Sequence, residues 1–141
     1  MRFMILVKAT ADSEAGVLPT SEQLEEMGKF NEELVKAGVL LDGGGLHDSG
    51  KGTRVHFADG KRTVVEGPFS ATEELVAGYW ILQVKSREEA VEWIKRCPLR
   101  DGQIEIRKLF EAEDFGEAFT PELREHEERL RSEVAAQAAS R

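Results

Sequence analysis

The sequence has a single cysteine and no long hydrophobic run, and each absence excludes a class of protein. One cysteine in 141 residues cannot form an internal disulfide, so we expect a reducing, cytoplasmic compartment rather than a disulfide-stapled secreted domain. No apolar stretch approaches the roughly 20 residues of a membrane-spanning helix, and the N-terminal residues lack the apolar segment of a signal peptide. We therefore expect no membrane partner.

Basic residues and metal ligands are also scarce. Nineteen Lys and Arg residues against 27 Asp and Glu residues give a net charge of −8, which repels phosphate backbones and disfavours nucleic acid as a partner. Three histidines and one cysteine do not assemble a familiar zinc site, so no metal is expected. The sequence has no P-loop, dinucleotide fingerprint or Gly-x-Ser-x-Gly elbow, and no cofactor is implied.

What is present is enough for one domain with a core, since 40% of the residues are apolar. Apolar or alternating runs predict strands, and capping residues followed by amphipathic stretches predict helices. Residues 9–19 have no periodicity and predict a loop, and Gly43–Gly45 is expected to interrupt the second strand with a bulge or turn. The expected strands cover 2–8, 39–41, 53–57, 62–66, 75–84 and 103–110, and the expected helices start after Thr20, Ser86 and Thr120.

Two of these elements carry specific local signals. Thr20 and Gln23 form a capping box before a helix whose apolar side is expected to hold Leu24, Met27, Asn31, Leu34 and Val35, with Phe30 beside it. Asp59-Gly60 between two β-prone segments predicts a tight hairpin, because both turn residues need a positive φ angle.

The order of elements is β-α-β, a hairpin, and then β-α-β. We therefore predict an α+β fold, a ferredoxin-like sandwich with an inserted β-hairpin and a C-terminal helix. Its helices cover one face of the sheet, and a second copy of the chain is the simplest cover for the other, which predicts a homodimer. We expect an α+β domain over residues 1–112 and an acidic extension with a helix over residues 113–141.

His47 is the best single candidate for acid–base chemistry. Its unperturbed pKa is about 6.5, and it follows a glycine-rich segment that could aim it into a cavity, with Asp42 or Asp48 to orient it. The alternative is a histidine on a surface loop. Glu66 ends a strand beside Gly67-Pro68 and could act as a base or bind a cation, whereas the alternative is ordinary turn chemistry.

Lys8 and Arg107 are expected on strands, where they could bind an anionic ligand or form a salt bridge at the sheet edge. Cys97 precedes Pro98 at the end of a helix, where nothing lowers a thiol pKa, so a catalytic cysteine is not expected. Trp80 and Trp93 are most simply explained as residues of the core or of a dimer interface.

Several segments together resemble the YCII-related domain family, and most closely its DGPF subgroup, which is named for an Asp-Gly-Pro-Phe motif. They are residues 1–8, 63–78 and 89–93, Cys97-Pro98 and 104–107, and the similarity extends over about residues 1–115. The sequence has Glu66 in place of the motif aspartate and Ser-Ala-Thr-Glu-Glu at 70–74 in place of the usual Ala-Glu-Thr-Lys-Glu.

The resemblance implies a dimeric α+β barrel and a site in which His47 works with Asp42 or Glu66. The leading functional hypothesis is a small-molecule-binding protein or enzyme-like dimer that transfers a proton on a small organic ligand. The alternative is a regulatory interaction module, since some members of the subgroup resemble partners of sigma-factor regions or are joined to them. The candidate catalytic residues are His47, Glu66 and Asp42, and the candidate binding residues are Lys8, Arg54, Gly67, Pro68, Phe69, Trp80 and Arg107.

Overall fold

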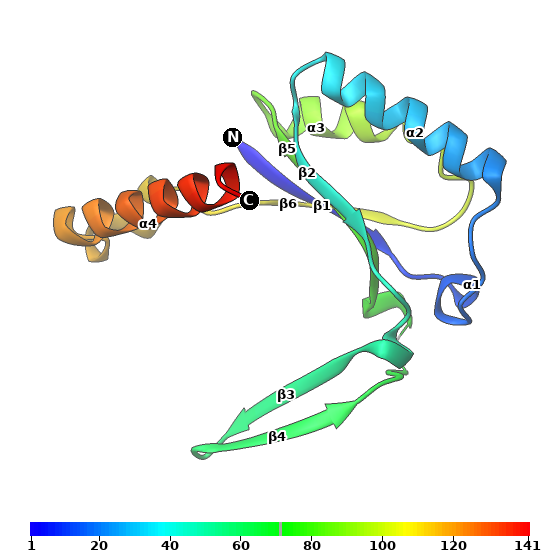
Figure 1. The fold of residues 1–141 in the computed structure, drawn as a ribbon, viewed down its shortest axis with the longest axis horizontal. Helices are drawn as coiled ribbons and strands as arrows, with labels where there is room; N and C mark the ends of the chain where they lie inside the picture. Colours follow the sequence, from blue (N-terminus) through cyan, green and yellow to red (C-terminus); the bar gives the residue numbers. More distant parts are fainter. Residues whose placement is uncertain (71) are drawn as a thin grey trace. The chain divides into compact units, whose positions relative to one another are not determined.

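A computed structural model of the chain describes residues 1–70 and 72–141 (Figure 1). Ala71, in the predicted polar connection 70–74, lies outside the described residues. The chain divides into two compact units, Met1–Leu109 and Phe110–Arg141, and each is treated by itself. Among the described residues, no helix is long and apolar enough to cross a membrane.

The first unit is built on a four-stranded antiparallel sheet with the order β2-β5-β1-β6. When the separate β3–β4 hairpin is left out of the count, the four strands lie in the order 2-3-1-4, which is compatible with a ferredoxin-like α+β fold. The strands are β1 (Arg2–Lys8), β2 (Leu40–Gly45), β5 (Val76–Gln83) and β6 (Ile104–Lys108).

Both long helices of this unit, α2 (Ser21–Lys36) and α3 (Arg87–Ile94), lie on the same side of the sheet (Figure 1). Burial alternates along β1, where Phe3 and Ile5 point into the core that the helices cover. Leu34 from α2 and Leu82 from β5 are fully buried in the same cluster. The opposite face carries Met4, Leu6, Lys8, Tyr79, Ile81, Glu105 and Arg107, and we call it the open face.

Helix α2 confirms the predicted capping box, since the Thr20 hydroxyl accepts from the Gln23 amide and the Gln23 side chain accepts from the Thr20 amide. The predicted apolar side was partly wrong. Phe30 and Leu34 are buried, whereas Leu24 and Val35 are 59% and 61% exposed. The buried stripe follows the spacing Met27–Phe30–Leu34, and Leu24 and Val35 both fall beside it on the same flank of the helix.

Two local predictions are corrected. The expected loop at 9–19 contains a short helix, α1 (Ala11–Glu14), which a reciprocal pair of hydrogen bonds between Thr10 and Ser13 caps. The glycines at 43–45 do not interrupt β2, because they pair with Trp80, Tyr79 and Gly78 of β5, and the register shift lies before them, between Leu40 and Asp42. A side chain at Gly43 would meet the Trp80 ring at 2.9 Å, so the close approach of the two strands requires glycine there.

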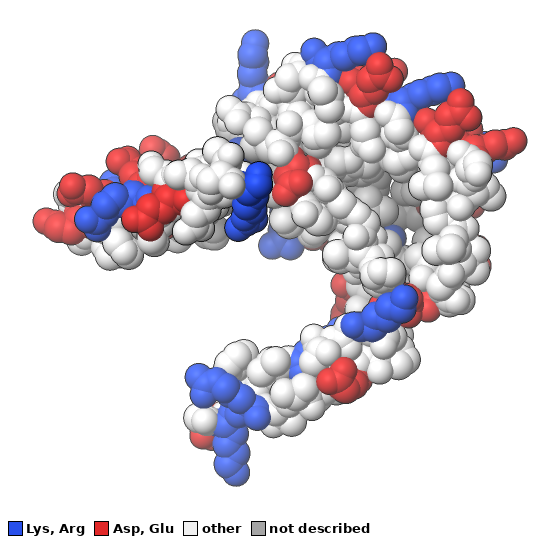
Figure 2. Space-filling model, in the orientation of Figure 1, with Lys and Arg blue, Asp and Glu red and all other residues white. Residues whose placement is uncertain are grey.

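Strands β3 (Thr53–Ala58) and β4 (Lys61–Glu66) pair as a two-stranded antiparallel hairpin. Its turn is Asp59-Gly60, with φ angles of 49° and 74°, as the Asp-Gly signal predicted. Every residue of both strands is exposed, and Figure 2 shows basic side chains gathered at the turn end, where Lys61 and Arg62 lie. The turn residues explain why the hairpin forms, and contacts at its base hold it to the sheet unit.

The second unit has a 3-10 segment, η3 (Ala112–Ala118), and a helix, α4 (Pro121–Ala139), which the Thr120 hydroxyl caps by accepting from the Leu123 amide. The Phe115 ring stacks on Phe110 with 4.8 Å between centroids and lies 5.4 Å from Phe119. The apolar residues expected to anchor this helix, Leu123, Leu130 and Val134, are 43–65% exposed. An apolar stripe this thin gives α4 little packing of its own.

Candidate functional site

One end of the sheet brings together two of the predicted functional residues. Lys8, the last residue of β1, pairs with Val76 at the start of β5. On the other side of β5, the Leu46 amide donates to the Ala77 carbonyl at 2.8 Å, and His47 follows directly. Lys8 and His47 therefore flank the same end of β5, with backbones about 10 Å apart because two strand spacings separate them.

Lys8 has an unusual environment for a lysine. Its side chain is only 15% exposed, yet its ammonium nitrogen lies 3.9 Å from Glu105 Oε1, at the limit of an ion pair. Arg107 competes for the same carboxylate, with Nη1 3.0 Å from Glu105 Oε2. The predicted salt bridge at the sheet edge is thus present for Arg107, and Glu105 is the carboxylate that sequence reasoning missed. The Lys8 charge is left weakly paired in a mostly buried position.

The surroundings of Lys8 on the open face are apolar and shaped by glycine. Leu6 and Tyr79 lie opposite each other on neighbouring strands, and both are half-buried. Gly44 lies opposite Tyr79 on the other side, where an added Cβ would rest 3.6 Å from the Tyr79 ring. Because Gly44 has no side chain, nothing projects from the sheet on that side of the Tyr79 ring. A small molecule with an apolar body and one anionic group fits this combination of residues.

His47 is exposed and has one described side-chain contact, a separation of 3.4 Å between its Nδ1 and the Lys51 ammonium nitrogen. An ammonium group can only donate, so a hydrogen bond in this contact requires Nδ1 as the acceptor and the ring N–H on Nε2. In that tautomer the Nε2–H can donate a hydrogen bond to a ligand.

The two predicted partners of His47 have local contacts instead. Glu66 Oε2 accepts from the Thr53 hydroxyl at 3.0 Å, across the first residue pair of the hairpin. Asp42 Oδ1 accepts from the amide of Gly43 at 2.8 Å. The described contacts therefore do not join either carboxylate to His47, and their catalytic roles stay predictions.

The segment from Gly67 to Phe69 fixes the base of the hairpin. The Gly67–Pro68 bond is cis, and a Cβ on Gly67 would lie 1.7 Å from the Ser49 carbonyl oxygen, so only glycine fits. The Phe69 ring lies under the Arg54 guanidinium, with 3.8 Å from Cζ to the ring centroid. The structure thus brings four predicted binding residues together at the base of the hairpin. We call this group the joint, and its members are Arg54, Gly67, Pro68 and Phe69.

Ser49 connects this joint to α1. Its hydroxyl donates to Glu14 Oε1 and accepts from the Phe69 amide at 2.9 Å, and its own amide donates to Glu14 Oε2 at 2.9 Å. Neither Glu14 nor Ser49 was a predicted site residue, because 35 positions separate them and no local pattern links them. Together they hold three separate segments at the end of the sheet that also carries Lys8.

Trp80 belongs to the core rather than to the open face. It is 7% exposed, and its ring meets Phe30 edge-on with 5.6 Å between centroids. Its indole N–H donates to Asn31 Oδ1 at 2.8 Å, which explains the polar residue on the inner side of α2. Of the two simple interpretations of Trp80, a core or an interface residue, the structure shows the core, and its predicted role in binding has no support from this position.

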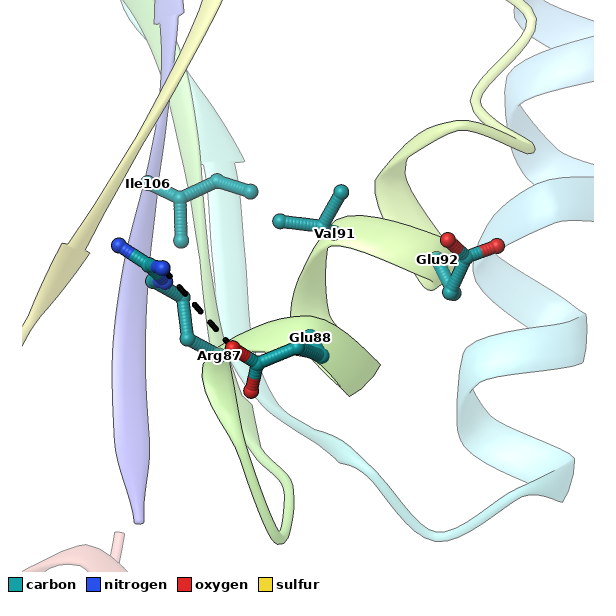
Figure 3. Close-up of a pocket in the computed structure, with 5 residues that line it drawn as sticks. All are labelled: Arg87, Glu88, Val91, Glu92 and Ile106. Atoms are coloured by element: carbon teal, nitrogen blue, oxygen red, sulfur yellow. Dashed lines mark ion pairs between the residues drawn. The ribbon is translucent and has the colours of Figure 1, made fainter.

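Two open hollows among the described residues lie along α3, and neither is lined by His47 or Glu66. The first, of about 260 Å³, opens between α3 and β6, where Val91 and Ile106 face each other (Figure 3). No group of three or more possible metal ligands occurs among the described residues. Burial raises the pKa of the Cys97 thiol despite an opposing backbone hydrogen bond involving Leu99, so the structure gives this cysteine no activation.

The fold and this sheet end define a small α+β protein with a largely buried cation on the open face of its sheet. The YCII-related domain model matches residues 1–113, and the chain therefore belongs to the YCII-related domain family. A search of curated proteins finds no match to the chain.

Proposed function

We propose that the protein is a small-molecule-binding homodimer of the DGPF subgroup, with its ligand site on the open face beside Lys8. The observation that carries the proposal is the 15% exposure of the Lys8 side chain together with its 3.9 Å separation from Glu105. A charge withdrawn from water costs free energy unless a close partner compensates it. The carboxylate of a small organic ligand would supply that partner, and Leu6 and Tyr79 would contact its apolar body.

The proposal assigns proton transfer to His47. It lies at the same end of the sheet as Lys8, and the Lys51 contact at Nδ1 leaves Nε2 to face a ligand. Donation of a proton from Nε2 uses the doubly protonated imidazolium, which becomes the neutral ring when the proton passes to the ligand. A ligand held by Lys8 would have to extend across β5 to reach His47, a span of about 10 Å. An elongated organic acid meets this requirement better than a compact inorganic anion.

The homodimer is part of the same proposal. The open face includes the half-buried apolar residues Met4, Leu6 and Ile81, which no helix of the described first unit covers. The same face carries Lys8 and Glu105, charges of both signs that a two-fold-related copy can match. A second copy packed face to face, as in the dimeric α+β barrel implied by the resemblance, would enclose the ligand site.

A screen of organic acids tests the ligand site. Benzoate, succinate and acetate are added to ¹⁵N-labelled protein, and the backbone amide shifts are followed by NMR. We expect the longer acids to shift the amides of Leu6, Lys8, Tyr79 and Glu105, and Lys8→Met to remove the response. Lys36→Met is the matched control, because Lys36 is 74% exposed in a surface ion pair with Glu32. Shifts that persist in Lys8→Met would contradict the site.

A second candidate function, a regulatory interaction module, is favoured by one observation on the second unit. Phe110 and Phe115 are stacked but remain 64% and 52% exposed. Acidic residues surround them, including Glu113 and Glu117, which suits a basic protein surface. Deleting the residues after Phe110 would remove partner binding and preserve the homodimer, whereas an unchanged interaction would contradict this role.

A further inference from the structure

Strand β6 is at the edge of the sheet, and among the described residues only one of its two edges is paired. The Lys8 amide donates to the Gln103 carbonyl and the Leu109 amide to the Arg2 carbonyl, both at 2.9 Å. Because hydrogen-bonded pairs alternate along an antiparallel ladder, every second residue of β6 faces β1. The backbone groups of Ile104 and Ile106 therefore point to the outer edge.

The side chains of β6 are complementary to a second copy of the same strand. In an antiparallel pair centred on Ile106, Glu105 lies opposite Arg107 of the partner subunit, and Arg107 lies opposite the partner's Glu105. Both side chains are on the open face and are already joined within one chain, with Arg107 Nη1 3.0 Å from Glu105 Oε2. Opposite charges directly across a strand pair stabilise it and like charges destabilise it, so the charges select this register.

We infer that β6 pairs with β6 of a second copy about a two-fold axis at Ile106, which joins two sheets edge to edge. Ile106 and the partner's Ile106 exchange the two hydrogen bonds at the axis, and the four charged side chains alternate in sign around it. An unpaired edge strand tends to pair with edge strands of other chains. An edge that is complementary to itself favours a contact between two copies about a two-fold axis.

The hollow between α3 and β6 supports the same contact. Val91 and Ile106 form its apolar lining, and Arg87 reaches over it from the start of α3 (Figure 3). Pairing brings the partner's Ile106 beside this lining, because residues at the centre of the register share the face that points to the helices. The contact uses the outer edge of β6, whereas the ligand site uses Lys8. Glu105 and Arg107 belong to both, so the register of the cross-link, and not self-association alone, separates the two proposals.

Cysteine cross-linking tests the register directly. Glu105→Cys and Arg107→Cys are made separately in a Cys97→Ser background, mixed, allowed to exchange subunits and oxidised with copper phenanthroline. Residues 105 and 107 of opposite copies would have Cα atoms about 4.5 Å apart, within disulfide reach, whereas like residues would lie roughly 7–8 Å apart on the diagonal. We expect the mixed 105–107 product to exceed like-with-like products at least tenfold by mass spectrometry.

Arg62→Cys mixed with Glu105→Cys is the control, since Arg62 lies on the hairpin. A statistical mixture of products, or no 105–107 product, would overturn the pairing.

A charge exchange provides a second measurement by sedimentation equilibrium. Arg107→Glu is expected to weaken self-association at least tenfold, and Glu105→Arg combined with Arg107→Glu to restore it. If a dimer persists without the mixed cross-link, the edge pairing fails and the face-to-face contact stands.

Discussion

Glu14 and Ser49, 35 residues apart, are joined by two hydrogen bonds, because one Glu14 oxygen accepts from the Ser49 amide and the other from the Ser49 hydroxyl. The same hydroxyl accepts from the Phe69 amide at 2.9 Å. One serine therefore fixes α1, the segment after His47 and the base of the hairpin relative to one another. This arrangement sets the direction in which the chain leaves the sheet on both sides of the hairpin.

Replacing Ser49 with alanine tests this joint. The substitution leaves the Phe69 amide and one Glu14 oxygen without their partner, and we expect a loss of about 1–3 kcal/mol in the free energy of unfolding. Urea denaturation monitored by circular dichroism gives the value. Ser140→Ala, near the C-terminus, is the control and should change stability by less than about 0.5 kcal/mol. Equal effects of the two substitutions would contradict the structural role of Ser49.

Gly67 is expected to be intolerant of any side chain. A Cβ there would lie 1.7 Å from the Ser49 carbonyl oxygen, so Gly67→Ala must displace backbone, and we expect a loss of more than about 2 kcal/mol. Gly28→Ala is the opposite case, because Gly28 is inside α2 with no atom within 4 Å of its added Cβ, and it should gain about 0.5–1 kcal/mol. Chemical denaturation of both variants checks the contrast in sign.

The contact between Trp80 and Asn31 contributes to the core as a polar pair. Asn31→Ala would leave the buried indole N–H without an acceptor, at a cost of about 1–3 kcal/mol. Trp80→Phe removes the donor as well, so the effect of Asn31→Ala should be smaller in that background. A double-mutant cycle from urea unfolding curves measures the coupling. Strict additivity of the two substitutions would show that the hydrogen bond contributes nothing.

Cys97 is expected to react slowly with thiol reagents. Burial raises the pKa of its thiol, so the thiolate fraction at pH 8 is smaller than that of a free cysteine, and the labelling rate should keep rising with pH beyond the range where a free thiol levels off. Labelling with a chromogenic disulfide reagent, in native buffer and in urea, measures the rates. A native rate equal to the unfolded rate at every pH would be inconsistent with the raised pKa.

Much of the fold could be predicted because its signals are local. The Thr20–Gln23 capping box and the Asp59-Gly60 turn each lie within four residues, and both occur in the structure. Helix α1 was missed, since four residues are too few to show a helical period. From the sequence alone the glycines 43–45 predict an interruption of the strand, because only the neighbouring Trp80 explains why they pair without side chains.

The site was harder to predict, because its contacts join distant parts of the chain. Lys8 and His47 are candidates by their residue types, and only the topology places them at one end of β5. The sequence does not point to Glu105, because there it is an ordinary polar residue of an alternating strand. Its importance follows from the two cations, Lys8 and Arg107, that share its carboxylate.

The affinity of the protein for the tightest-binding organic acid of the NMR screen, measured by isothermal titration calorimetry, tests the central claim most directly. Lys8→Met should weaken binding by about ten- to a hundredfold, since a charge-assisted hydrogen bond contributes about 1.5–3 kcal/mol. Glu105→Gln should strengthen binding, because it removes the carboxylate that competes for the Lys8 ammonium group. Equal affinities in the wild type and both variants would show that Lys8 does not bind the ligand.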